Sequence, residues 1–108
     1  MAFERACAVS DVTNANPLAV TVDGVAVALV RQGEDFYAIY DECSHAAIPL
    51  SEGEVEDGEI ECWLHGSRFD LRTGKPSGPP ATEPVPTYPV RVDGDDLLVD
   101  VASPYPND

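Results

Sequence analysis

The sequence predicts an all-β domain built as an antiparallel β-sandwich. Short stretches rich in β-branched and aromatic residues recur along the chain, and Asp-Gly dipeptides separate three pairs of them. No window combines apolar residues at helical spacing with a capping residue in front of them. Ten prolines, eight of them after position 75, leave little room for a helix in the last third of the chain.

The expected strands are short and follow one another along the whole chain. Asp-Gly between two apolar stretches is a strong signal for a two-residue hairpin turn, and it occurs at Asp23-Gly24, Asp57-Gly58 and Asp93-Gly94. A further turn is expected at Gln32-Gly33-Glu34. The expected strands are 3–9, 18–22, 25–30, 35–40, 55–57, 59–61, 88–92 and 97–101.

Length and charge limit the classes of protein to which the chain can belong. Its 108 residues predict a single domain, expected to span 1–102 and to leave 103–108 as a flexible tail. A net charge of −14 argues against binding to nucleic acid or anionic membranes and favours a partner with a basic docking face. The longest apolar run, 25–30, is too short to span a membrane, and no export signal is visible. We therefore expect a cytoplasmic monomer.

The residues that bind soft metals are scarce and gather in two short segments. Both histidines and two of the three cysteines lie in Cys43-Ser44-His45 and Cys62-Trp63-Leu64-His65, with sixteen residues between His45 and Cys62. Two thiolates and two imidazoles suit either a tetrahedral zinc site or a [2Fe–2S] cluster with cysteines on one iron and histidines on the other. Each segment pairs one cysteine with one histidine, which is uncommon in structural zinc sites and natural in a two-iron centre.

The chain between these segments explains how they could meet. A hairpin centred on Asp57-Gly58 would carry the chain away from the first segment and return it beside that segment. Both segments would then lie at one end of the sandwich. The third cysteine, Cys7, matches no ligand position and is expected to be a buried strand residue. No disulfide framework is available, which fits a reducing compartment.

The two segments resemble the Rieske [2Fe–2S] signature. The resemblance continues through His65-Gly66-Ser67-Arg68-Phe69-Asp70 and Arg72-Thr73-Gly74 into a proline loop at 75–80, and it covers roughly 9–101. It implies a Rieske-type β-sandwich with a small cluster-binding subdomain, whose loops span about 42–50 and 62–70. It also implies one cluster per chain, with the inner iron on Cys43 and Cys62 and the solvent-facing outer iron on His45 and His65.

The flanking residues bear on the redox potential that the resemblance implies. High-potential members of the family carry an extra cysteine in each loop, joined as a disulfide, where this chain has Ile48 and Leu64. They also place a serine and a tyrosine near the cluster; here Ser67 is kept and Phe69 replaces the tyrosine. We expect a potential toward the low end of the Rieske range of about −150 to +300 mV.

Acidic residues beside the segments also favour a low redox potential. Carboxylates at Glu42 and Glu61 would disfavour the negative charge that reduction adds. Arg68 and Lys75 are expected to be solvated surface residues.

The resemblance implies a Rieske-type ferredoxin of the kind that serves bacterial non-haem iron aromatic-ring dioxygenases. Such a protein is an electron carrier and no enzyme itself: it passes one electron at a time from a flavin-dependent NAD(P)H reductase to a terminal oxygenase. The sequence shows no nucleophile–base pair, phosphate loop or nucleotide fingerprint, and we expect a standalone carrier without a mononuclear iron domain. The alternatives are the small Rieske-like subunit of an NAD(P)H nitrite reductase, an accessory protein of iron–sulfur cluster assembly, and a structural zinc protein.

Overall fold

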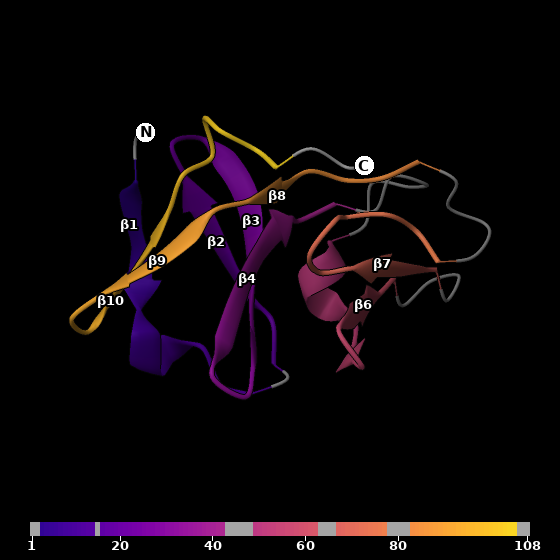
Figure 1. Cartoon of the computed structure of the whole chain (residues 1–108), viewed down its shortest axis with the longest axis horizontal. Helices are drawn as coiled ribbons and strands as arrows, with labels where there is room; N and C mark the ends of the chain where they lie inside the picture. The colour runs from indigo at the N-terminus through magenta and orange to yellow at the C-terminus, as the bar shows by residue number, and fades with distance from the viewer. Residues whose placement is uncertain (1–2, 15, 43–48, 63–66, 78–82, 106–108) are drawn as a thin grey trace.

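The structure is a computed structural model that describes residues 3–14, 16–42, 49–62, 67–77 and 83–105. These residues form ten β-strands and two short 3₁₀ helices, and they contain no α-helix. The strands make three antiparallel sheets (Figure 1). The predicted all-β class is therefore confirmed. Within the same residues, no helix is long and apolar enough to cross a membrane.

The three sheets differ in size and in the part of the chain that supplies them. The first sheet has the order β1 (Glu4–Ala8), β10 (Asp96–Val99) and β9 (Val90–Asp93). The second has the order β2 (Leu18–Val22), β3 (Val25–Gln32), β4 (Asp35–Tyr40) and β8 (Thr87–Tyr88). The third has the order β5 (Val55–Glu56), β6 (Glu59–Glu61) and β7 (Arg68–Asp70). The 3₁₀ helices are η1 (Val9–Asp11) and η2 (Leu50–Glu52).

Glycine-containing turns set the register of the hairpins. Asp23 and Gly24 have φ of 49° and 78°, and Asp57 and Gly58 have φ of 52° and 78°, which is the pattern of type I′ turns. The third hairpin turns one residue later than predicted, because Asp93 pairs with Asp96 in the ladder. Its loop is Gly94-Asp95, with Gly94 at φ 63° in the first loop position, where type II′ turns need glycine.

Two strands differ from the predicted ones by more than a shift of one or two residues at an end. The expected strand 88–92 is divided by Pro89, so that Tyr88 ends β8 and Val90 begins β9. Proline has no N–H for a sheet ladder and is found at such breaks. Strand β7 was not predicted, because its three residues include a single apolar side chain, Phe69.

The third sheet belongs to an insertion, residues 41–86, between two neighbouring strands of the second sheet. β4 and β8 are antiparallel neighbours, with Ala38 paired to Tyr88, and the Tyr40 N–H donates to the Pro86 carbonyl at 2.9 Å. The insertion therefore leaves and rejoins the second sheet at nearly the same place. Figure 1 shows its strands β6 and β7 set to one end of the molecule, away from the two larger sheets. This arrangement matches the small subdomain that the sequence leads us to expect.

Two buried cores share strands β3 and β4. Alternate residues of β3 face opposite sides, so that Ala28 and Val30 lie in one core and Val27 and Leu29 in the other. This is why the apolar run predicted at 25–30 is nearly continuous. The insertion core consists of Ala28, Val30, Ile39, Leu50, Ile60, Cys62, Phe69, Leu71 and Val85. The base core consists of Cys7, Val12, Val22, Val27, Leu29, Ala38, Tyr88, Leu97 and Val99.

The described part of the expected tail, 103–105, contacts the second sheet. The Tyr105 N–H donates to the Thr87 carbonyl at 2.8 Å, while half of the Tyr105 surface remains exposed. The division into a domain at 1–102 and a flexible tail at 103–108 stays a prediction.

Candidate metal centre

Cys62 is the predicted ligand that the structure describes. It follows directly on β6, its side chain is fully buried in the insertion core, and its thiol is free of any disulfide. The other three predicted ligands, Cys43, His45 and His65, lie outside the described residues. A buried, unpaired thiol at the end of a strand is a suitable metal ligand, and its chemistry fits the cysteine side of a Rieske-type centre.

A hydrogen bond joins the two residues between which the second segment runs, Cys62 and Ser67. β6 and β7 pair through Glu61 with Arg68 and Ile60 with Phe69, and one step beyond them the Cys62 N–H donates to the Ser67 carbonyl at 2.6 Å. Ser67 itself is 1 % exposed. The predicted ligand segment is thus held at both ends by a strand ladder that continues into Cys62 and Ser67.

The residues on either side of the first loop are joined by the Asp41 side chain. Asp41 follows β4, and its Oδ1 accepts the Ser51 N–H at 2.7 Å while its Oδ2 accepts the Ser51 hydroxyl at 2.8 Å. Ser51 lies in η2, which packs beside β6 (Figure 1). Residues 42–50, the expected first loop, therefore begin and end at one pair of hydrogen-bonded residues.

The described ends of both segments meet in the insertion core. Leu50, the last residue of the expected first loop, and Cys62, the first residue of the expected second loop, are both fully buried there with Ile60 and Phe69. That the two ligand segments themselves lie side by side stays a prediction, because Cys43, His45 and His65 lie outside the described residues. Phe69 contributes an apolar ring at the position where the high-potential proteins have tyrosine, so it brings no hydroxyl to this core.

Arg68 is a partly exposed residue, and its ion pairs are a feature that the sequence does not predict. Its Nε lies 3.2 Å from Glu61 Oε2, and a terminal guanidinium nitrogen lies 4.0 Å from Glu59 Oε1. The Arg68 side chain is 40 % exposed, so the pair adds little to stability. It does offset the Glu61 charge on which the expectation of a low potential partly rested. One signal in the sequence could have predicted these ion pairs: Glu59 and Glu61 alternate along β6, opposite the single basic residue of β7, Arg68.

Cys7 lies in the base core, as expected for a structural cysteine. It is 7 % exposed and is a free thiol. Burial raises the pKa of the Cys7 thiol, with Asp11 adding to the rise and Arg5 opposing it. The thiol is therefore held in its neutral form, which is a poor metal ligand.

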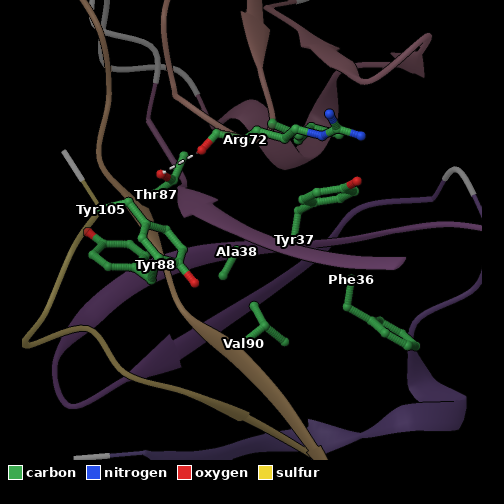
Figure 2. Close-up of a pocket in the computed structure, with 9 residues that line it drawn as sticks. Phe36, Tyr37, Ala38, Arg72, Thr87, Tyr88, Val90 and Tyr105 are labelled. Carbon is green, nitrogen blue, oxygen red and sulfur yellow. Dashed lines mark hydrogen bonds between the residues drawn. The ribbon is translucent and has the colours of Figure 1, made fainter. Parts of the chain in front are cut away.

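A cavity of about 440 Å³ lies beside the second sheet, away from the described metal ligand. Figure 2 shows Tyr37, Tyr88 and Tyr105 along it, with the Thr87 hydroxyl donating to the Arg72 carbonyl at 3.3 Å. A hydrogen bond to Tyr37 raises the pKa of the Arg72 guanidinium. Among the residues that the structure describes, Cys62 is not part of this lining.

Comparison with known proteins identifies the family. Residues 3–89 match the model of the Rieske [2Fe-2S] domain, which is most of the chain. The chain is 43 % identical over 101 residues to the biphenyl dioxygenase ferredoxin subunit of Pseudomonas sp. (strain KKS102), and the match covers 93 % of both proteins.

Two solved structures of similar proteins share the fold. The ferredoxin of carbazole 1,9a-dioxygenase from Nocardioides aromaticivorans IC177 is 42 % identical, with a TM-score of 0.87, over 92 % of this chain and 97 % of that chain. A ferredoxin solved in a complex of reduced oxygenase and oxidized ferredoxin in carbazole 1,9a-dioxygenase is 35 % identical, with a TM-score of 0.83, over 90 % of this chain and 91 % of that chain. The buried Cys62 thiol, the all-β fold with its inserted subdomain and these similarities agree: the chain belongs to the Rieske [2Fe-2S] family and is a ferredoxin-type electron carrier with a Rieske-type cluster.

Proposed function

We propose that this protein carries single electrons from a flavin-dependent NAD(P)H reductase to a terminal non-haem iron oxygenase. The observation that carries the proposal is the 43 % identity to a dioxygenase ferredoxin subunit over 93 % of both chains. The similar ferredoxin in the carbazole 1,9a-dioxygenase structure was solved in complex with an oxygenase, which supports an oxygenase as the partner type. The charge of −14 suits a basic docking face on either partner.

The proposed cluster ligands are Cys43, His45, Cys62 and His65. The family match, the paired Cys–His spacing and the buried Cys62 thiol support this set. The cluster supplies a one-electron couple that needs no proton or atom transfer from the protein. The protein side chains have other tasks: the insertion core keeps water from the Cys62 thiolate, and Arg68 moderates the negative charge of Glu61 beside it.

We propose a cytoplasmic monomer with a single domain at 1–102 and a tail at 103–108. A permanent subunit of a nitrite reductase should present a large apolar docking face. Within the described residues, the large hydrophobic side chains that are exposed are Val92 and Tyr105 alone. This surface favours a carrier that meets its partners transiently.

Metal analysis and electron-transfer assays test the proposal. The purified protein should contain two irons and two sulfides per chain and give a Rieske-type paramagnetic signal on reduction. Cys62→Ser should abolish that signal because it removes a thiolate ligand, whereas Cys7→Ser should keep it. The reduced protein should then deliver one electron to a non-haem iron oxygenase of this class. A colourless protein with one zinc per chain would refute the proposal, and delivery only to a nitrite reductase would reassign the partner.

A further inference from the structure

We infer that Asp41, Ser51 and Gly53, none of them a proposed ligand, are positioning residues for the cluster. Together they connect the residues that flank the first ligand loop to the residue that precedes the second. The inference rests on the proposed four-ligand set. It concerns the protein residues that fix the distance between the segments, and it is carried by contacts outside both ligand loops.

The first contact joins Asp41 to η2. Both carboxylate oxygens of Asp41 accept hydrogen bonds from Ser51, one from the N–H at 2.7 Å and one from the hydroxyl at 2.8 Å. η2 needs such a partner, because its N-cap residue is Pro49 and no side-chain hydrogen bond caps it locally. Asp41 is itself anchored, since its N–H donates to the Ala26 carbonyl of β3 at 3.0 Å. The carboxylate thus holds η2 against the second sheet.

The second contact joins the end of η2 to β6. Gly53 follows η2, and its N–H donates to the Leu50 carbonyl at 2.9 Å. Its φ of −89° is open to any residue, so backbone conformation does not explain the glycine. Space does: a Cβ at Gly53 would collide with the backbone carbonyl of Glu61. The Glu61 N–H also donates to the Glu54 carbonyl at 2.8 Å, which locks this close approach.

These contacts form a continuous path between the two segments. The path runs from Asp41, two residues before Cys43, through Ser51 and Gly53 to Glu61, the residue before Cys62. It consists of one short side-chain bridge followed by backbone contacts, so it has little rotamer freedom. A change at Asp41 or Gly53 should therefore alter the relative placement of Cys43 and Cys62, which belong to the same iron in the proposed site.

The test uses the cluster-loaded protein and a carboxylate variant series. Asp41→Ala should raise the rate of cluster loss to a chelator about tenfold and broaden the paramagnetic signal of the reduced protein. Asp41→Asn should stay within about twofold of the wild-type rate, because the amide oxygen can still accept the Ser51 N–H. Ser51→Ala should give a smaller increase than Asp41→Ala. Asp96→Ala is the matched control: it removes an exposed carboxylate that pairs with Arg5 at 2.8 Å in the first sheet, and it should change neither readout.

A glycine pair tests the second contact independently. Gly53→Ala should speed cluster loss and shift the redox potential, since β6 must move to accept the methyl group. Gly94→Ala is its control: Gly94 has φ of 63° and open space around it, so alanine there adds backbone strain far from the insertion. That variant should lose stability to urea and keep the wild-type potential and spectrum.

The outcomes separate positioning from simple stabilisation. If Asp41→Ala and Gly53→Ala weaken resistance to urea but keep the spectrum, potential and release rate of the controls, the inference is overturned. Should Asp41→Ala fail to fold, a wild-type release rate and spectrum in Ser51→Ala and in Gly53→Ala would overturn it as well. A wild-type protein that binds no iron overturns the proposed ligand set together with this inference, whereas a loaded wild type with unaffected variants overturns this inference alone.

Discussion

Cys7 and Cys62 show how position decides the chemistry of one residue type. Both are buried free thiols, but Cys7 lies within β1, paired with Leu97, and faces the base core, whereas Cys62 follows β6 where the chain leaves the sheet. Burial among apolar side chains favours the neutral thiol. A thiolate can be kept in such surroundings when a metal compensates its charge, and this is the role proposed for Cys62.

Cys7 should make stability depend on alkaline pH. Its pKa is raised in the folded protein, so the folded state keeps the proton after the unfolded chain has begun to lose it above about pH 8.5. The contribution of Cys7 is full below that pH and is lost as pH rises toward the folded pKa, with a slope of at most about 1.4 kcal/mol per pH unit. Urea titrations at about pH 7.5 and 9.5 should show a smaller alkaline loss for Cys7→Ala than for the wild type. An equal loss of stability in both proteins would contradict a raised pKa of the Cys7 thiol in the folded state.

Arg68 should tune the redox potential through its charge. Removing the positive charge that pairs with Glu61, the residue before Cys62, disfavours the electron-rich state, so Arg68→Gln should lower the potential by about 20–40 mV, the effect of a partly exposed charge. The matched control is Arg5→Gln, which breaks the exposed Arg5–Asp96 pair in the first sheet. Redox titrations at low and high salt measure both. An unchanged potential in Arg68→Gln, or an equal drop in Arg5→Gln, would argue against this electrostatic role.

At the scale of elements, the sequence predicted the hairpins better than the ligand surroundings. Asp23-Gly24 and Asp57-Gly58 were recognisable because a type I′ turn requires positive φ at both positions. The register at Gly94 was missed by one residue, since Asp-Gly and Gly-Asp turns both fit the local sequence. The Asp41–Ser51 bridge was not predictable, because ordinary polar residues ten positions apart carry no signal of mutual contact.

The two cores should respond differently to the same cavity. Leu50 lies in the insertion core and Leu97 in the base core, and both are fully buried. Replacing either by alanine should cost about 2–5 kcal/mol of the free energy of unfolding. Only Leu50→Ala should also speed cluster loss to a chelator, because it loosens the packing around Cys62. Urea titration and absorbance decay measure the two effects, and faster loss in Leu97→Ala would contradict this division.

For the whole molecule, charge is the dominant property. The net charge of −14 produces a long-range attraction to basic partners that salt screens over about 10 Å at 0.1 M. The ion pairs of Arg5 and Arg68 leave this net charge unchanged, because both arginines are already counted in it. Association with a partner should therefore depend on diffusion guided by charge, and the docked complex should be short-lived.

The rate of electron transfer should reveal this guidance. Raising the salt from about 0.02 M to 0.3 M should slow the bimolecular reaction with a reductase about tenfold or more, since screening shortens the reach of the attraction. Stopped-flow absorbance of the reduced and oxidised protein follows the reaction directly. Reduction by a small uncharged reagent is the control and should be independent of salt. A rate with the reductase that rises with salt would show that apolar contacts govern the encounter.

The adjacent ends of the insertion have a consequence for how such proteins diversify. Because Tyr40 and Pro86 are hydrogen-bonded neighbours, residues 41–86 can lengthen or shorten without moving the sheet that carries them, and longer loops add little closure entropy. Exchange of the whole segment between related proteins is limited instead by packing. The segment packs on three side chains of the second sheet, Ala28, Val30 and Ile39. A chimaera that receives the segment together with matching residues at these three positions should fold. A chimaera with mismatched residues there should have a cavity or a steric clash beneath the cluster.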